Sequence, residues 1–330
     1  MGTPAETFAL TVGNCRAEAR DVVVLELQRP DAAPLPAFAP GAHLDVRLPN
    51  GLVRQYSIAN DCRDRQRYVL GILREAPGHG RGGSEYVHRS LAAGVELQVT
   101  GPINNFELDP GAGAYRFIAG GIGITPILSM LQWCRANGRP WHLVYATRSR
   151  CRCAFYEALH QLDPNGSHVT WHFDDEAGHH LDAARALQPL SPGELVYCCG
   201  PRPLMGAVRE QLADRPGVAR FESFLKAGEK SPSDAAAAAT AERAFTVTLR
   251  RSGRSLAVPA DKSILEVLED NGISVPFSCR EGECGTCVTQ VCEGVPEHRD
   301  FVLTDAERAS NRMMCLCVSR AKTGNLVLDL

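Results

Sequence analysis

The spacing of the cysteines near the carboxyl end constrains this chain more than any other feature. Cys279, Cys284 and Cys287 form a C-x4-C-x2-C run, and Cys317 follows after 29 further residues. This is the ligand spacing of a plant-type [2Fe–2S] cluster, which is held by four thiolates. Structural zinc sites usually separate two C-x2-C pairs instead. The run therefore predicts a carrier of single electrons near the end of the chain.

The fourth ligand of this cluster is not fixed by spacing. Cys315 and Cys317 lie two residues apart, and Cys292 is a third candidate. Because alternate residues of a strand point to the same face, periodicity does not choose between Cys315 and Cys317. Gly282 and Gly285 keep the ligand loop small, so that backbone N–H groups can point at the sulfurs and influence the potential.

Composition limits the class of protein. The 330 residues are enough for two or three domains, and the net charge of −3 without basic blocks argues against a nucleic-acid partner. The amino terminus lacks a basic segment followed by an apolar run, so we expect no signal peptide. Residues 117–134 are mostly apolar, but glycines, Thr125 and Pro126 favour a strand, a turn and a helix over a membrane span. Thirteen cysteines without secretion point to a reducing compartment, so we expect a cytoplasmic protein with no membrane partner.

The first hundred residues show the pattern of an antiparallel β-barrel or sandwich. Short alternating or β-branched runs are separated by Pro, Gly and Asn, which is typical of strands joined by turns. The runs cover residues 8–12, 22–27, 43–48, 54–58, 68–73 and 95–100.

From Tyr115 onward the pattern changes to alternating strands and helices, which predicts a doubly wound α/β domain with a parallel sheet. A helix follows the first strand and ends near Asn137, with Gly138 as its stop. The strands are expected at residues 116–119, 141–147, 168–173 and 195–199.

A third, α+β domain follows an alanine-rich linker that lacks apolar periodicity. Its first helix begins with a capping box formed by Ser263 and Glu266. Strands are expected before this helix, at residues 245–250, and at the end of the chain, at residues 326–328. We predict domains at residues 1–108, 109–227 and 243–330, with the linker at 228–242.

Two glycine-rich turns mark the α/β domain. Gly120, Gly121 and Gly123 follow a strand and open a helix, where Thr125 can cap and Pro126 can occupy the first helical position. Such a turn lets a backbone approach a pyrophosphate at a helix amino terminus, but it also suits close packing of strand and helix. The second turn is Cys199-Gly200-Pro201, at the carboxyl end of a later strand of the same sheet.

Two further motifs lie in the β domain. Arg54, Tyr56 and Ser57 offer a phosphate ligand, a stacking ring and a hydrogen-bonding hydroxyl, although an ordinary exposed strand has the same pattern. Gly82-Gly83-Ser84 can form a phosphate nest or a flexible loop.

Taken together, these motifs resemble the phthalate dioxygenase reductase family, to which vanillate O-demethylase reductases are closely related. The resemblance covers essentially the whole chain and includes the order R-x-Y-S, G-G-x-G-x-T-P, C-G-P and a carboxyl-terminal ferredoxin. It implies an FMN-binding barrel, an NAD(P)-binding domain and a plant-type, β-grasp-like ferredoxin domain. The implied cofactors are FMN, NADH and one [2Fe–2S] cluster.

The resemblance also implies roles for residues around the flavin. Arg54 and residues 82–84 would hold the FMN phosphate, Tyr56 would contact the isoalloxazine ring, and Ser57 would lie at its N5 edge. Phe224 matches an aromatic residue expected beside the flavin.

At the nucleotide site, the resemblance places Thr125 between the flavin and the nicotinamide, and Cys199 near the nicotinamide ring. Ser57 and Cys199 are therefore the expected catalytic contacts. The same resemblance chooses Cys317 as the fourth iron ligand. One departure concerns Arg148 and Ser149, which stand where relatives that prefer NADH carry an acid and which suit the 2′-phosphate of NADPH.

The implied function is a reductase in which NAD(P)H delivers a hydride to FMN, and the cluster passes single electrons to a Rieske-type oxygenase. That oxygenase would hydroxylate an aromatic ring or demethylate an aryl methyl ether. A cytochrome P450 partner is the alternative, as is a non-catalytic redox sensor, which would oxidise NADH negligibly with an artificial acceptor. A vestigial ferredoxin domain would leave a flavin reductase without an iron signal in electron paramagnetic resonance.

Overall fold

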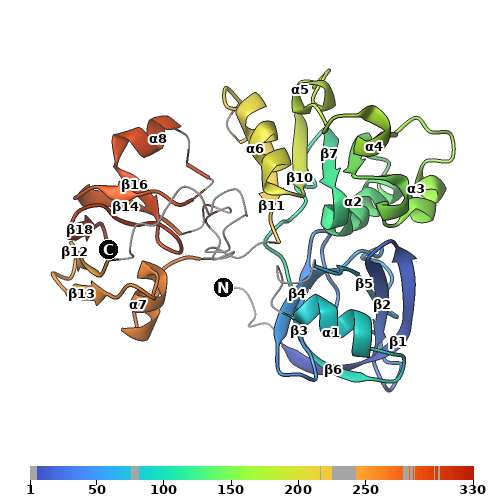
Figure 1. The fold of residues 1–330 in the computed structure, drawn as a ribbon, viewed down its shortest axis with the longest axis horizontal. Coiled ribbons are helices and arrows are strands. Elements are labelled where there is room, and N and C mark those ends of the chain that lie inside the picture. The colour runs from blue at the N-terminus through green and yellow to red at the C-terminus, as the bar shows by residue number, and fades with distance from the viewer. Residues whose placement is uncertain are drawn as a thin grey trace. The chain divides into compact units, whose positions relative to one another are not determined.

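The chain divides into two compact units, Met1–Glu222 and Ser223–Leu330, each of which is described separately (Figure 1). The larger unit contains two sheets and the smaller unit contains the cysteine-rich segment. The predicted linker, Cys279 and Cys284 lie outside the described residues. The computed structural model describes residues 6–75, 82–215, 217–224, 243–277, 282, 285, 287–300, 302–303 and 305–330.

The amino-terminal part is an antiparallel barrel of six strands in the order β4-β3-β6-β1-β2-β5. A bridge between Ile58 and Leu70 joins its two edges. Helix α1 (Gly83–Ser90) buries Val87 in the barrel core. The strands are β1 (Thr7–Ala19), β2 (Val22–Gln28), β3 (His43–Arg47), β4 (Val53–Ser57), β5 (Tyr68–Leu73) and β6 (Glu96–Ile103).

The second part of this unit is a parallel sheet with strand order β11-β10-β7-β8-β9. Separate apolar clusters cover its two faces, so the sheet is doubly wound as predicted. Its strands are β7 (Ala114–Gly120), β8 (Trp141–Thr147), β9 (Val169–Phe173), β10 (Glu194–Cys199) and β11 (Ala219–Glu222). Its helices are η1 (Gly121–Gly123), α2 (Ile124–Ala136), η2 (Arg150–Arg152), α3 (Tyr156–Leu162), α4 (Asp174–Ala177), α5 (Ala183–Ala186) and α6 (Arg202–Gln211).

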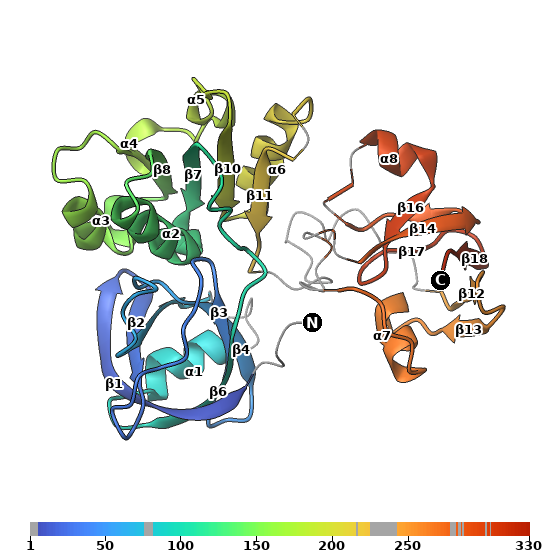
Figure 2. The ribbon, with the colours of Figure 1, turned by 180° about the vertical axis from the view of Figure 1, so that it is seen from behind.

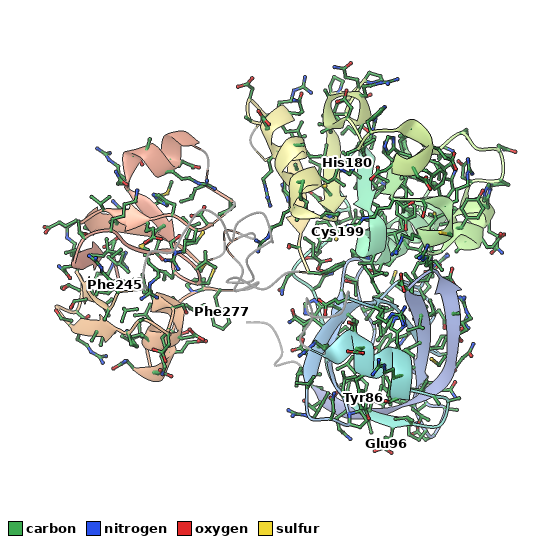
Figure 3. All side chains as sticks on the ribbon, viewed as in Figure 1. Tyr86, Glu96, His180, Cys199, Phe245 and Phe277 are labelled. Carbon is green, nitrogen blue, oxygen red and sulfur yellow. The ribbon has the colours of Figure 1, made fainter. Side chains whose placement is uncertain are left out.

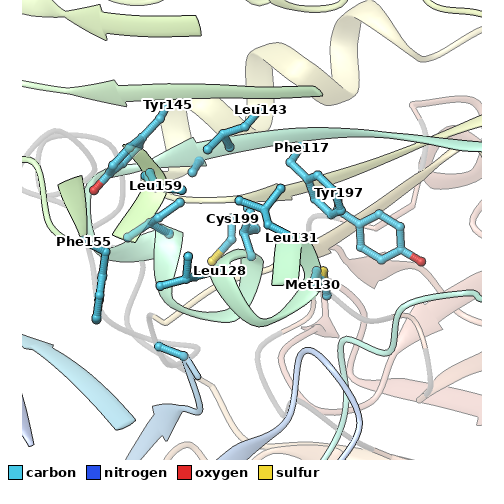
Figure 4. Close-up of a cluster of buried hydrophobic side chains, with 14 of the residues drawn as sticks. Phe117, Leu128, Met130, Leu131, Leu143, Tyr145, Phe155, Leu159, Tyr197 and Cys199 are labelled. Atoms are coloured by element: carbon cyan, nitrogen blue, oxygen red, sulfur yellow. The ribbon is translucent and has the colours of Figure 1, made fainter. Parts of the chain in front are cut away.

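One apolar core joins the barrel to the parallel sheet (Figure 4). Val22 and Val24 of β2 belong to the same buried cluster as Leu128 of α2. Polar contacts reinforce the junction, because the N–H of Phe155 donates to Glu18 Oε1 over 2.9 Å. The barrel and the sheet therefore form a single packed body.

The carboxyl-terminal unit has a sheet of order β13-β12-β18-β14-β16, in which β12 and β18 are parallel. Helices α7 and α8 lie on opposite sides of these strands (Figure 2). The pattern is that of the predicted α+β domain. Its elements are β12 (Phe245–Leu249), β13 (Ser255–Val258), α7 (Ile264–Asp270), β14 (Val288–Glu293), β15 (Pro296–Glu297), α8 (Asp305–Ser310), β16 (Met313–Cys315), β17 (Arg320–Ala321) and β18 (Asn325–Leu328).

Local signals were accurate at some helix ends and wrong at one. The capping box is present, since Ser263 Oγ accepts from the N–H of Glu266 and the N–H of Ser263 donates to Glu266 Oε2. Gly138 has a φ of 59° just beyond α2, as the predicted stop requires. Thr125, however, does not cap α2. The helix begins one residue earlier, at Ile124, so Pro126 is its third residue and not its first as predicted. The Thr125 hydroxyl donates back to the carbonyl of Ile122 over 3.0 Å.

Candidate functional site

The amino terminus of α1 and the side chain of Arg54 form a site suited to an anion. Gly82 precedes the helix with a φ of 74° and provides no side-chain cap. Gly83 lies so close to Arg54 of β4 that a Cβ atom would approach its Nε to 2.3 Å. The first-turn N–H groups of the helix and the guanidinium can therefore face the same ligand, which is the arrangement that binds a phosphate.

Ser84 is 7% exposed and is already engaged with Glu75. Its hydroxyl accepts from the N–H of Glu75 over 3.2 Å and lies 3.3 Å from Glu75 Oε2, to which it donates. Sequence reasoning missed Glu75, because no motif marks it. The Ser84 hydroxyl is thus hydrogen-bonded to a carboxylate, and its contact with the FMN phosphate stays a prediction.

Tyr56 and Ser57 follow Arg54 on the same strand, and two buried polar groups near them lack a partner among the described residues. The Tyr56 hydroxyl is buried and has no hydrogen-bond partner among the described residues, and burial raises its pKa. Ser57, which is 4% exposed, pairs across the sheet with His43 of β3. Nε2 of His43 also lacks a partner in the described part of the chain. Buried polar groups are normally hydrogen-bonded, so these atoms fit a site completed by a bound group.

The two glycine-rich turns meet at the switch point of the parallel sheet. Strands β7 and β10 are neighbours there, and Cys199 pairs with Ala119. A Cβ on Gly123 would lie 2.2 Å from the carbonyl oxygen of Cys199, and one on Gly200 would lie 2.9 Å from Gly120 Cα. Both glycines are needed for this backbone contact, so the packing interpretation is correct for these positions. Because ligands bind at such switch points, the position of the two turns is also the one expected for a nucleotide site.

Gly121, by contrast, is not required by packing. Its φ is 54°, and a Cβ there would meet no atom within 4 Å. The open space beside this residue, at the carboxyl end of β7, leaves the backbone accessible to a ligand.

Thr125 and Cys199 line the junction between the sheet and the barrel. Thr125 is 2% exposed, and its Cγ2 lies 2.8 Å from the position of a Cβ on Gly71 in barrel strand β5. Cys199 is labelled in Figure 3 at the end of the sheet that faces the barrel, and its side chain is fully buried in the shared core. Thr125 therefore lies between the two sheets, and its place between the flavin and the nicotinamide stays a prediction. The Cys199 thiol lies within the core, so a contact with the nicotinamide stays a prediction.

The segment after β8 presents Arg148 and Ser149 near the same edge of the sheet. Arg148 is exposed, and Ser149 Oγ lies 3.2 Å from Cys151 Sγ. Arg150 is instead held by Glu176 and stacks over the ring of Phe173, with 4.5 Å from the guanidinium carbon to the ring centroid. Of the two arginines here, Arg148 is the one whose charge suits a 2′-phosphate.

Three cysteines gather in the carboxyl-terminal unit. The Sγ atoms of Cys287 and Cys317 lie 3.2 Å apart, and both residues are buried thiols. Cys315 also hydrogen-bonds Cys287, and these contacts lower the pKa of Cys287. Strand β16 ends at Cys315, so the alternation expected for residues 315 and 317 does not extend to Cys317, which lies in the following turn. Both Cys315 and Cys317 therefore contact Cys287, so these contacts do not choose between them as the fourth iron ligand.

Cys292 is separated from this group. It lies five residues beyond Cys287 along β14, which is about 16 Å of extended chain. Its thiol hydrogen-bonds the side chain of Arg250. Within the described ranges, no three His, Cys, Asp or Glu side chains are arranged to hold a metal ion. That finding does not include Cys279 and Cys284, since both fall outside those ranges.

Comparisons with known proteins agree with these two regions. The 2Fe-2S iron-sulfur cluster binding domain matches residues 247–322. The oxidoreductase NAD-binding domain matches residues 117–210. The first match contains the cysteine group and the second contains both glycine-rich turns.

The relatives extend this agreement to the whole chain. Phthalate dioxygenase reductase from Burkholderia cepacia is 42% identical over 344 residues, which cover 100% of both chains. This chain belongs to the phthalate dioxygenase reductase family. Vanillate O-demethylase oxidoreductase from Pseudomonas sp. (strain HR199 / DSM 7063) is 42% identical, over 96% of this chain and 97% of that protein. The solved structure of an intact type IV self-sufficient cytochrome P450 monooxygenase has a TM-score of 0.71 and 36% identity, and covers 99% of this chain and 41% of that one.

Membership of the phthalate dioxygenase reductase family makes this chain an NAD(P)H-dependent flavin and iron–sulfur oxidoreductase. The family uses FMN, and the residues present fit that group: Gly83 leaves room for Arg54, and the buried Tyr56 hydroxyl is without a partner in the described residues. Phe224 is 43% exposed and lies two residues beyond β11, so its place beside the flavin stays a prediction. In the described residues, no helix is long and apolar enough to cross a membrane.

Proposed function

We propose that this chain is the reductase component of an oxygenase system, taking electrons from NADH and passing them through FMN and a [2Fe–2S] cluster to a Rieske-type oxygenase. When bound, the flavin supplies the change from two-electron to one-electron transfer, and the cluster supplies one-electron carriage. The observation that carries the proposal is the 3.2 Å approach of Cys287 and Cys317 within a domain that matches an iron–sulfur family.

The residues divide this work between them. Arg54 and the first turn of α1 bind the FMN phosphate, because a guanidinium and a helix amino terminus both favour a double negative charge. Tyr56 and Ser57 contact the ring, and Phe224 keeps the role that the family pattern predicts for an aromatic residue beside the flavin. These residues position the flavin. Hydride transfer depends on the close approach of donor and acceptor, and it needs little acid–base chemistry from the protein.

The turns at the sheet edge position the nicotinamide dinucleotide. The backbone of residues 120–123 and of residues 199–201 forms the floor of this site, and Thr125 separates it from the flavin. Arg148 and Ser149 lie where the adenosine ribose is expected, so we propose that NADPH also serves as a donor.

The cluster ligands are Cys279, Cys284, Cys287 and Cys317. We choose Cys317 over Cys315 because Cys317 lies in a turn and is 7% exposed, whereas Cys315 is fully buried at the end of β16. A turn allows a thiolate to adjust to an iron more easily than a position within a strand pair. Cys292 is unsuited because of its distance from Cys287.

The test separates the flavin from the cluster. Cys284→Ser should still oxidise NADH and reduce its flavin. It should lose the electron paramagnetic resonance signal of the reduced cluster, and it should no longer transfer electrons to the oxygenase. Normal transfer by this variant to the Rieske component of a phthalate dioxygenase system would refute the proposed route.

A cytochrome P450 is the second candidate partner, because the solved P450 monooxygenase contains a portion similar to 99% of this chain. Stopped-flow transfer from the reduced protein to a Rieske component and to a P450 haem domain would distinguish the two. Faster transfer to the haem domain would favour the second candidate.

A further inference from the structure

A buried acidic residue, Asp300, lies in the carboxyl-terminal unit, outside the cysteine run and the capping box. Asp300 is 2% exposed, and its carboxylate accepts two hydrogen bonds from described residues. Oδ1 accepts from Ser319 Oγ over 3.2 Å, and Oδ2 accepts from the N–H of Leu303 over 3.0 Å. Ser319 is itself 1% exposed. A carboxylate this deeply buried is uncommon unless a structure or function requires it.

Asp300 contacts both parts of the chain that carry the proposed iron ligands. Gly282 lies between Cys279 and Cys284 in the sequence and has a φ of 74°. A Cβ on Gly282 would lie 3.0 Å from Asp300 Cα, so the loop backbone packs directly on this residue. On the other side, Ser319 follows Cys317 by two residues. Asp300 therefore lies next to Gly282 of the loop through its Cα and Cβ atoms, and next to the late turn through its carboxylate.

Its charge is only partly balanced. Nη2 of Arg308 donates to the Asp300 carbonyl oxygen over 2.6 Å and lies 3.7 Å from Oδ2, while the Arg308 side chain is 34% exposed. Nδ1 of His298 lies 3.6 Å from Oδ1, which is too long for a hydrogen bond. Both ring nitrogens of His298 are buried and have no hydrogen-bond partner among the residues described.

We propose that Asp300 is a positioning residue that holds the cysteine loop and, through its buried negative charge, keeps the reduction potential of the cluster low. Reduction adds negative charge to the cluster, and a nearby carboxylate in a medium of low dielectric opposes that addition. Arg308 acts in the opposite direction, and more weakly because its charge is partly solvated. This inference rests on the proposed function, since it requires the cluster that Cys287 and Cys317 help to bind.

The experiment is a redox titration of the holoprotein followed by electron paramagnetic resonance. Asp300→Asn removes the charge at nearly constant volume and should favour reduction of the cluster by about tenfold, equivalent to about +59 mV for one electron. Arg308→Gln should shift the potential in the negative direction. Asp329→Asn is the matched control, because Asp329 is 33% exposed and pairs with Arg251 over 2.9 Å on the same unit. It should leave the potential unchanged.

The opposite signs distinguish an electrostatic role from a purely structural one, because loss of packing alone would not reverse with the sign of the charge removed. An unchanged potential in Asp300→Asn overturns the inference and leaves the proposed function intact. If Asp300→Asn does not retain iron, Arg308→Gln decides: a lower potential supports the inference, and an unchanged or higher one overturns it. A wild-type protein without a cluster signal would overturn both the inference and the proposed function.

Discussion

Gly83→Ala should weaken FMN binding without unfolding the barrel. The added Cβ would lie 2.3 Å from Nε, 2.7 Å from Cγ and 3.0 Å from Cδ of Arg54. To reach an ordinary contact of 3.4 Å, Nε must move by about 1.1 Å (3.4 minus 2.3). Hydrogen bonds to a phosphate span only about 0.5 Å of donor–acceptor distance, so Arg54 would lose its contact.

The size of the effect follows from the bond that is lost. A hydrogen bond to a charged group contributes about 1.5–3 kcal/mol, and each 1.4 kcal/mol is a tenfold change in affinity. FMN should therefore bind roughly 10–100-fold more weakly to Gly83→Ala. Stability should not fall, because Arg54 is flexible and alanine is a better helix former than glycine by about 1 kcal/mol.

The assay is a fluorescence titration of the deflavinated protein with FMN. Gly206→Ala is the control, since Gly206 lies in α6 and a Cβ there would meet no atom within 4 Å. The double variant Arg54→Ala, Gly83→Ala should bind FMN as Arg54→Ala alone does, because both changes remove the same contact. A dissociation constant for Gly83→Ala within about twofold of wild type would refute the reasoning, as that is far below the predicted tenfold change.

Three further changes test the packing. Ser263→Ala should destabilise the carboxyl-terminal unit by about 1 kcal/mol through loss of the helix cap, as measured by thermal melting; no change would contradict the capping role. Arg116→Met should lower the free energy of unfolding in urea by about 3–5 kcal/mol, because it removes the ion-pair partner of the buried Glu194 carboxylate, 3.0 Å from Arg116 Nε. An unchanged free energy of unfolding would contradict this role of the ion pair. Burial lowers the pKa of His43 below its ordinary 6.5. The contribution of the neutral His43 ring to the free energy of unfolding is therefore fully present above pH 6.5, and it is lost as the pH falls through the pKa of the folded state. His43→Gln should flatten this acid loss in urea unfolding at several pH values, and an unchanged acid limb would exclude His43 as its source.

Much of the fold could be predicted from the sequence, because local patterns determine it. Strands such as β8 (Trp141–Thr147) are apolar runs bounded by turns, and the structure has them at the predicted positions. Strand β11 (Ala219–Glu222) was missed, because it is a short edge strand with half-exposed side chains and no clear alternation. The prediction for Thr125 was wrong because the 3₁₀ turn η1 directly precedes α2 and moves the helix start to Ile124.

The sites were predictable only as far as motifs mark them. Arg54 and Cys287 belong to recognisable patterns, and the structure places each beside another predicted residue. Asp300 was not predictable, because the run from His298 to Asp300 consists of charged or polar residues and reads as an exposed turn. Its burial depends on Ser319, which lies nineteen positions away in the sequence, so no local pattern records the contact.

The apolar core shared by β2 and α2 has a consequence for how this protein can be divided. Val22, Val24 and Leu128 lose their contact with water together, so separating the barrel from the parallel sheet would expose an apolar face on each piece. The two parts should therefore melt in one cooperative transition, and neither should be a portable module. The carboxyl-terminal unit has its own core around Leu268 and Leu326. It is therefore the part of the chain that could be exchanged as a whole between related reductases. Recombination at the segment between the units would preserve the hydride-accepting body and change only the electron-delivering one.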